Sequence, residues 1–159
     1  MGKGALKPMT TFVLDTDILT DLEYRKADVT RQFTEHLKLG RMAVTDVNIL
    51  ERLRGWELKI QQTKSRTELA RYYQNLGKAA KFLTLFTVVH VTETALEQTA
   101  LLKARVRKLK LRGEAKPGDR DLLIACIILE QVDTVLVTHN TKHFVEFLPP
   151  SKLLDWIHS

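Results

Sequence analysis

The stretch FVLDTDIL, residues 12–19, places three apolar residues directly before two carboxylates, Asp15 and Asp17. Its apolar start predicts a strand over residues 12–15, at the centre of a parallel sheet that is covered on both faces. Functional groups in such sheets gather beyond the carboxyl ends of the strands. Asp15 is the first side chain to emerge there, and Asp17 would share its side if the extended conformation continued. This stretch therefore predicts a buried strand that ends at an acidic edge.

The composition of the 159 residues predicts one compact domain, because 44% are hydrophobic and only 7 are Gly and 4 Pro. We expect that domain over residues 9–159, with residues 1–8 as a flexible leader or cloning remnant. No apolar run approaches the roughly 20 residues that span a bilayer, and no signal-peptide core follows the N-terminus. Cys126 is the only cysteine, which excludes an internal disulfide and a cysteine metal cluster. These features predict a cytoplasmic protein without a membrane helix.

The remaining pattern alternates strands with helices. Strands are predicted over residues 42–44, 87–91, 134–137 and 153–157, and helices over 20–39, 63–82, 92–111, 122–129 and 142–147, with one more after residue 44. Thr45 is the expected N-cap of that helix, and Gly55 its expected end. Arg112-Gly113 would stop the fourth helix, and Pro117-Gly118 would open the fifth. The alternation predicts a three-layer α/β/α domain around a central, mostly parallel sheet.

Three acids and an amide are expected to meet at the carboxyl edge of this sheet: Asp15, Glu51, Asp121 and Asn140. Each alone has an ordinary explanation as a turn residue, a surface ion pair, a helix-start acid or an Asx-turn. Together, close carboxylates would repel by about 4 kcal/mol per pair at an effective dielectric of 20, so a cation is expected among them. Oxygen ligands without a cysteine cluster suit Mg²⁺ or Mn²⁺ better than zinc.

The motifs FVLDTDIL, VNILERLRG, DRDLLIACIIL and VLVTHNTKHF, in this order, resemble the PIN-domain ribonucleases, in particular the VapC-like toxins of toxin–antitoxin modules. The likeness runs from Phe12 to Ile157. It implies that Asp15, Glu51 and Asp121 are the three acids of the family. Asn140 stands where many members carry a fourth Asp, and Thr138 matches a threonine that supports the site.

This resemblance implies a metal-dependent endoribonuclease in which Asp15 and Asp121 coordinate Mg²⁺ or Mn²⁺ directly, while Glu51 and Asn140 act through water. It further implies a homodimer and a small antitoxin whose C-terminal segment inserts near the acids.

The formal charge of +6 is unevenly distributed and suits RNA binding. Residues 52–81 hold eight Lys or Arg against two Glu, and residues 103–116 hold seven against one. The candidate RNA contacts are Arg52, Arg54, Lys108 and Lys110, with Trp56, Tyr72 and Tyr73 as aromatics that could stack bases. A solvated helix face and core packing are the alternative explanations of these charges and aromatics.

Several assignments stay open within this interpretation. Asp119 and Asp121 lie about 200° apart on a helix, so one faces the cluster; we choose Asp121 and give Asp119 the N-cap. Asp17 would hold a metal-bound water or order the turn. His139 and His143 have a spacing found in helical metal sites, although a structural role is the stronger interpretation.

Two other functions are compatible with the motifs. The DTD sequence also resembles haloacid-dehalogenase phosphatases, in which Asp15 would be the nucleophile. Leu19 departs from that motif, and a polar loop precedes Gly118-Asp119 where a strand is expected. A non-catalytic PIN-like module that binds nucleic acid is the remaining alternative, since Asn140 removes one charge from the acidic set.

Overall fold

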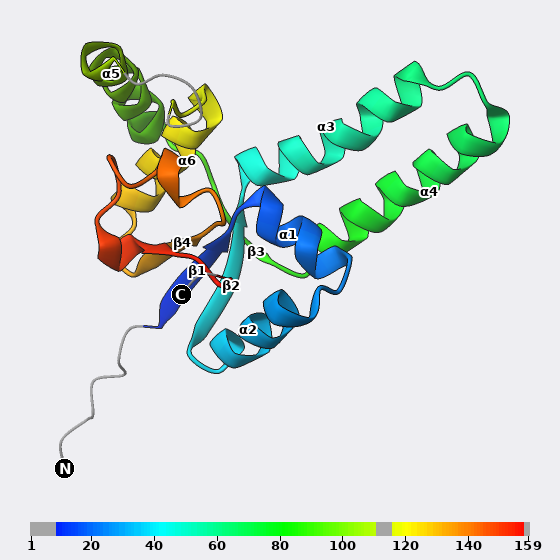
Figure 1. Cartoon of the computed structure of the whole chain (residues 1–159), viewed down its shortest axis with the longest axis horizontal. Coiled ribbons are helices and arrows are strands. Elements are labelled where there is room, and N and C mark those ends of the chain that lie inside the picture. Colours follow the sequence, from blue (N-terminus) through cyan, green and yellow to red (C-terminus); the bar gives the residue numbers. More distant parts are fainter. Residues whose placement is uncertain (1–8, 111–115, 158–159) are drawn as a thin grey trace.

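The structure is a computed structural model that describes residues 9–110 and 116–157. The expected leader over residues 1–8 and the predicted stop at Arg112-Gly113 lie outside these ranges. Within them, the sheet comprises β1 (Thr10–Leu14), β2 (Gly40–Thr45), β3 (Thr87–Val89), β4 (Thr134–Val137) and β5 (Leu153–Leu154). The strand order is β3-β2-β1-β4-β5, and every neighbouring pair is parallel (Figure 1). The expected parallel sheet with the FVLD strand at its centre is confirmed.

Helices cover both faces of this sheet. They are α1 (Thr16–Glu23), α2 (Ala27–Leu37), α3 (Asp46–Gln62), α4 (Arg66–Leu83), α5 (Glu93–Leu109) and α6 (Asp119–Glu130), with short 3₁₀ turns η2 (Thr141–His143) and η3 (Pro150–Lys152). Successive residues of β1 point to opposite faces. Val13 packs in a core cluster with α5 and α6, whereas Phe12 and Leu14 pack in a second cluster with α1, α2 and the end of α4. The three-layer α/β/α architecture is therefore confirmed.

The predicted single helix over residues 20–39 is wrong, because the chain forms two helices and the first begins before residue 20. Helix α1 starts at Thr16, directly after the strand, and ends at the C-cap Tyr24. Arg25 adopts φ 54°, a left-handed backbone that cannot continue an α-helix. The turn is held by an ion pair between Lys26 Nζ and Asp21 Oδ1 at 2.6 Å. Helix α2 then leaves in a new direction.

Helix α3 confirms Thr45 as its N-cap, since the Thr45 side chain accepts a hydrogen bond from the Asn48 N–H. The expected end at Gly55 is wrong. Added side-chain atoms at Gly55 would meet nothing within 4 Å, and the helix continues to Gln62 along α4. Three other predicted elements are shorter than expected. The helix at 142–147 is the 3₁₀ turn η2, and the strands at 87–91 and 153–157 contain three and two residues.

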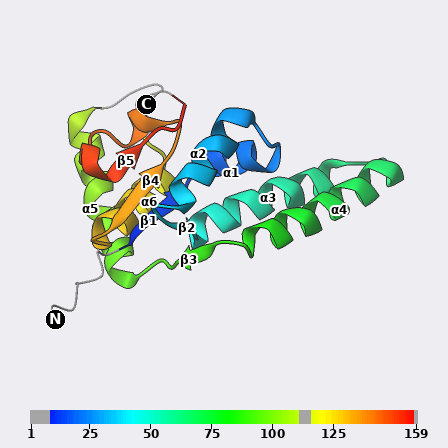
Figure 2. The same ribbon diagram turned by 90° about the horizontal axis from the view of Figure 1, so that it is seen from below.

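The antiparallel pair α3 and α4 projects from the body as a long hairpin (Figures 1 and 2). In α3 the buried residues are Val47 and Asn48, at its start; in α4 they are Ala79 and Leu83, near its end. The hairpin is therefore anchored to the sheet at its root, and within the described ranges its outer turns pack on one another.

Two local features fix how neighbouring elements meet. Lys152 Nζ donates to the main-chain oxygens of Ile128 (3.1 Å) and Gln131 (2.5 Å), which closes the C-terminal end of α6. At the start of β2, a Cβ atom on Gly40 would overlap the carbonyl oxygen of Thr10, so only glycine lets β1 and β2 approach there. In the described ranges, none of the helices has the length and apolar character needed to cross a membrane.

Candidate active site

Asp15 lies at the junction of β1 and α1, where the strand ends and its side chain caps the helix. Its Oδ1 accepts hydrogen bonds from the Thr16 N–H at 2.9 Å and from Asn48 Nδ2 at 3.2 Å. Its Oδ2 accepts from Thr138 Oγ1 at 2.8 Å, at the end of the adjacent strand β4. The residue is only 7% exposed. All three donors are uncharged, so they orient the carboxylate without neutralising it.

The pKa of Asp15 is raised from 3.8 to about 7. Burial is the largest cause, the negative charges of Asp17 and Asp121 act in the same direction, and the hydrogen bonds from Thr138 and Thr16 partly oppose the rise. A carboxyl group with this pKa is near half-ionised at neutral pH. A nearby cation would favour its ionised form, which is the behaviour expected of a metal-binding or acid–base group.

Asp17 approaches this group from the first turn of α1, so the extended conformation that would have put it on the same side as Asp15 does not continue. The strand ends at Leu14, and helix φ/ψ values begin at Thr16. The Asp17 Oδ2 nevertheless accepts the His139 N–H at 2.9 Å, which holds it beside the end of β4. Burial raises the pKa of Asp17, and this hydrogen bond opposes the rise.

Glu51 joins the site from the second turn of α3. Its Oε2 accepts from Thr16 Oγ1 at 2.7 Å, and Thr16 Oγ1 lies 3.4 Å from Asn48 Nδ2. Because the same Asn48 amide binds Asp15, a short chain of hydrogen bonds connects the two acids. The other oxygen, Oε1, accepts from Arg120 Nη1 at 2.8 Å. The ion-pair partner of Glu51 is thus on α6 and not one of its sequence neighbours.

Asp119 and Asp121 both lie in the first turn of α6, but their side chains have different surroundings. Asp119 is the first helical residue and not the predicted N-cap, a position that Gly118 holds. Its carboxylate is 72% exposed and pairs with Lys103 Nζ on α5 at 2.9 Å. Asp121 instead accepts the Gly118 N–H at 3.1 Å and lies close enough to Asp15 to influence its pKa. Of the two, Asp121 is the residue that the structure brings to the cluster.

The segment after β4 contributes an exposed amide and two histidines. Asn140 follows the strand as expected; its N–H donates to Thr138 Oγ1 at 3.1 Å, and its side chain is exposed. His139 bridges Asp155 and Asp21, with ring nitrogens 3.1 Å from an oxygen of each. These contacts give His139 a structural role. Because η2 is a 3₁₀ turn, His139 and His143 do not lie one turn apart on an α-helix, as a helical metal site would require.

His143 lies in the acidic cluster itself. Its Nδ1 is 3.0 Å from Asp121 Oδ2, and its side chain is 22% exposed. Both peripheral acids, Glu51 and Asp121, thus have a basic side chain beside them, while Asp15 is surrounded by the uncharged donors described above.

The predicted RNA contacts occupy different environments. Arg52 forms an ion pair with Glu23, and its side chain is only 13% exposed. Arg54, Lys108 and Lys110 are exposed. For the aromatics, Trp56 and Tyr72 pack together across the hairpin with ring centroids 6.2 Å apart, and Tyr73 is 58% exposed.

Three residues of this site were not predicted from the sequence. Asn48 is fully buried, and its spacing from Thr45 is the i, i+3 pattern of a capping box, a signal that the sequence does carry. Thr16 and Arg120 gave no such signal, because their partners lie 35 and 69 residues away in the chain.

Comparison with known proteins identifies the fold. No family model matches the chain, and no curated protein matches it. Solved structures do. DNA-bound VapBC from Salmonella typhimurium matches with 22% identity and a TM-score of 0.67, covering 93% of this chain and 99% of the other. VapBC2 from Rickettsia felis, bound to a promoter DNA fragment, matches with 22% identity and a TM-score of 0.69, covering 92% and 98%. FitAcB from Neisseria gonorrhoeae matches with 14% identity and a TM-score of 0.66, covering 93% and 99%.

The fold is that of a VapC-like PIN domain. The resemblance drawn from the four motifs is thus confirmed for the architecture of nearly the whole chain. At these identities the likeness shows the fold alone, so the activity must be argued from the side chains.

Proposed function

We propose that this protein is a divalent-metal-dependent endoribonuclease, the toxin of a toxin–antitoxin pair. The observation that carries the proposal is the buried carboxyl group of Asp15. Its pKa is about 7, and Asp17 and Asp121 add negative charge around it. The group lies at the carboxyl ends of β1 and β4, where ligands bind in α/β sheets.

A Mg²⁺ or Mn²⁺ ion fits the chemistry of these donors, since all are carboxylate oxygens and Asp15 has only uncharged hydrogen-bond donors. Within residues 9–110 and 116–157, no three His, Cys, Asp or Glu side chains are placed to surround an ion. The ion would therefore be held by Asp15 and Asp121, with water in its other positions. Mg²⁺ commonly keeps several waters and uses one or two carboxylates. When bound, such an ion supplies an activated water and stabilises charge on the phosphate.

The protein residues have separate tasks in this scheme. In its ionised form Asp15 would hold a cation, and Thr138 and Asn48 hold its two oxygens in place. Glu51, fixed by Thr16, and the exposed amide of Asn140 face the same edge and would contact water there. The chemistry is hydrolysis: water adds to phosphorus, the bond to the leaving oxygen breaks, and no covalent intermediate forms on the protein.

RNA is the proposed substrate because the chain is basic and exposed cations lie on helices α3 and α5. Arg54 on α3 and Lys108 and Lys110 at the end of α5 are exposed and could neutralise backbone phosphates. Arg52 would contribute through the ion pair that fixes α3 to α1 and not through direct contact. A homodimer is also proposed; a measurement of molar mass in solution tests it.

The test is cleavage of a defined RNA by the purified protein with Mg²⁺, Mn²⁺ or a chelator. We expect cleavage only with metal, and we expect Asp15→Asn and Asp121→Asn to lose it while remaining folded by circular dichroism. Asp119→Asn is the matched control, because this acid lies two residues from Asp121 but pairs with Lys103 away from the cluster. Full activity in either site variant would contradict the proposal.

A binding module without activity is the second candidate. It is favoured by Asn140, which removes one acid, and by the basic side chains beside Glu51 and Asp121. RNA that shifts in a gel with no cleavage under any metal would support it. Trapping of an acid-stable, alkali-labile phosphate on Asp15 would instead support the phosphatase chemistry.

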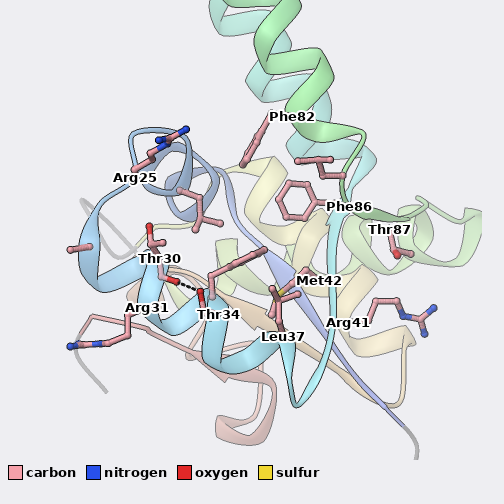
Figure 3. Close-up of a pocket in the computed structure, with 14 residues that line it drawn as sticks. Arg25, Thr30, Arg31, Thr34, Leu37, Arg41, Met42, Phe82, Phe86 and Thr87 are labelled. Carbon is pink, nitrogen blue, oxygen red and sulfur yellow. Dashed lines mark hydrogen bonds between the residues drawn. The ribbon is translucent and has the colours of Figure 1, made fainter.

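A partner surface is proposed at a groove of about 820 Å³ that is separate from the acids (Figure 3). The groove is lined mainly by apolar side chains from α1, α2, β2 and the end of α4, so we assign catalysis to the acids and not to the groove. Arg25, Arg31 and Arg41 stand along it. This combination fits an amphipathic helical segment that carries carboxylates, which we assign to an antitoxin. One matching solved structure is titled a toxin–antitoxin complex from Klebsiella pneumoniae, and another is VapBC-1 from nontypeable Haemophilus influenzae.

Co-expression with the neighbouring open reading frame tests the partner. We expect growth arrest by the protein alone, rescue by the neighbour, and co-purification of the two chains. Leu37→Asp in the groove, where Leu37 is 50% exposed, should prevent co-purification. Leu101→Asp on α5 is the control, since Leu101 is 64% exposed and lies outside the groove. Equal loss with both variants would contradict this surface.

A further inference from the structure

Arg120 has a position that the proposed function has not yet used. It is the second residue of α6, between Asp119, which pairs with Lys103, and Asp121, which joins the acids. Its Nη1 reaches across to α3 and donates to Glu51 Oε1 at 2.8 Å. A permanently charged guanidinium therefore bridges α6 and α3 at the acidic edge.

The contact connects Arg120 to the buried acid through specific hydrogen bonds. Glu51 also accepts from Thr16 Oγ1, Thr16 lies beside the Asn48 amide, and that amide donates to Asp15. The guanidinium is thus one end of a network whose other end is the carboxylate with the raised pKa. It is part of the site and not an isolated surface charge.

Arg120 is nevertheless accessible. Its side chain is 48% exposed, against 25% for Glu51, and the contact with Glu51 uses one nitrogen of the guanidinium. The planar guanidinium carries five N–H donors whose geometry matches two phosphate oxygens. An exposed ion pair of this kind contributes little to stability, so retaining its geometry is not required for folding.

We propose that Arg120 binds the scissile phosphate of the RNA, and that its pairing with Glu51 is the resting arrangement of the substrate-free site. This inference rests on the proposed function. Negative charge grows on the phosphoryl oxygens as water adds to phosphorus, and a fixed guanidinium stabilises that charge. Arg120 neither gains nor loses a proton in this step. With Asn140 in place of a fourth acid, the site also has one fewer ligand for a second metal, and Arg120 supplies a positive charge at its edge.

Pairing with Glu51 and binding phosphate predict different effects of an Arg120 substitution on metal binding and on RNA cleavage. Removing its charge should leave Mn²⁺ binding unchanged or tighter, because a competing cation beside Glu51 is lost. The same change should weaken RNA cleavage by roughly 100- to 1,000-fold in kcat, the range found when one preorganised donor to a developing oxyanion is removed. A residue that merely holds the fold together would weaken both.

The experiment compares Arg120→Gln and Arg120→Lys with the matched control Lys103→Gln. Lys103 is a cation of similar exposure, 47%, that pairs with the adjacent Asp119. Mn²⁺ binding is measured without RNA by electron paramagnetic resonance, RNA affinity in Ca²⁺, and cleavage in Mg²⁺. We expect Gln to lose cleavage and RNA affinity, Lys to keep part of both, and Lys103→Gln to match the wild type.

Wild-type cleavage by Arg120→Gln would overturn this inference alone, and so would weaker Mn²⁺ binding, which would make Arg120 a structural support. Absence of cleavage by the wild-type protein with every metal would instead overturn the proposed function. Circular dichroism and thermal unfolding of each variant verify that it is folded.

Discussion

Replacing Asp15 with Asn should stabilise the protein, and the gain should increase as the pH rises from 5 to 8. The pKa of Asp15 is about 7 in the folded protein, against an ordinary value of 3.8. Folding therefore holds the proton more tightly than the unfolded chain does. The contribution of this group to stability is fully present below pH 3.8 and is lost as the pH rises through 7.

The size of the effect follows from the pKa difference. At about 1.36 kcal/mol per pKa unit, the full difference corresponds to roughly 4 kcal/mol above pH 8. Between pH 5 and pH 8, the difference in unfolding free energy between Asp15→Asn and the wild type should grow by roughly 2.5 kcal/mol. The Asn amide changes local hydrogen bonds, but that offset is independent of pH. Other titrating groups occur in both proteins and cancel in the difference.

Urea unfolding at pH 5, 6, 7 and 8, in the presence of a chelator, measures this difference. Asp28→Asn is the control, because the Asp28 side chain is 70% exposed and its variant should parallel the wild type. Adding Mn²⁺ at pH 7 should stabilise the wild type and not Asp15→Asn. If the difference in unfolding free energy between Asp15→Asn and the wild type changes by less than about 0.5 kcal/mol from pH 5 to pH 8, the pKa of this carboxyl group is not raised by burial and nearby negative charge.

Three further predictions follow from single contacts, and Gly77→Ala is the control for one of them. Thr138→Val removes the hydroxyl donor to Asp15, so the pKa of that carboxyl should rise above 7 and the acid limb of the cleavage pH profile should shift upward. Gly40→Ala should cost roughly 1–3 kcal/mol in urea unfolding, because the strands must separate; Gly77→Ala in α4, with nothing within 4 Å, should add about 0.5–1 kcal/mol. Lys152→Met should cost about 1–3 kcal/mol, since carbonyls at the end of α6 lose a charged donor, and hydrogen exchange should increase there.

The central layer of the fold was predictable because its signal is local. Residues 12–15 are apolar and then acidic, and Thr45 begins its helix with a side-chain cap, so the central strand and the start of α3 could be located from short stretches. The break at Arg25 could not, because a non-glycine residue in the left-handed region has no sequence signature. Gly55 misled the prediction in the opposite way. Glycine often ends a helix, but Gly55 lies inside α3, which packs along α4.

Within the site, sequence spacing selected the acids but not their partners. Asp121 could be preferred over Asp119 from helical geometry, and the exposure of Asp119 agrees with that choice. The contacts of Arg120 and His143 with the acids depend on how α6, α3 and η2 meet. Such contacts join residues distant in the chain, and no periodicity encodes them.

The projecting hairpin of α3 and α4 has a practical consequence. Because the chain at residues 63–65, where it reverses direction, is far from the root that carries Glu51, probes attached there should disturb neither the sheet nor the acids. A fluorophore on Lys64 would report the approach of a large polyanion by quenching or anisotropy. Lengthening the connection by a few residues should likewise be tolerated, which makes this tip the natural point for tethering the protein to a surface.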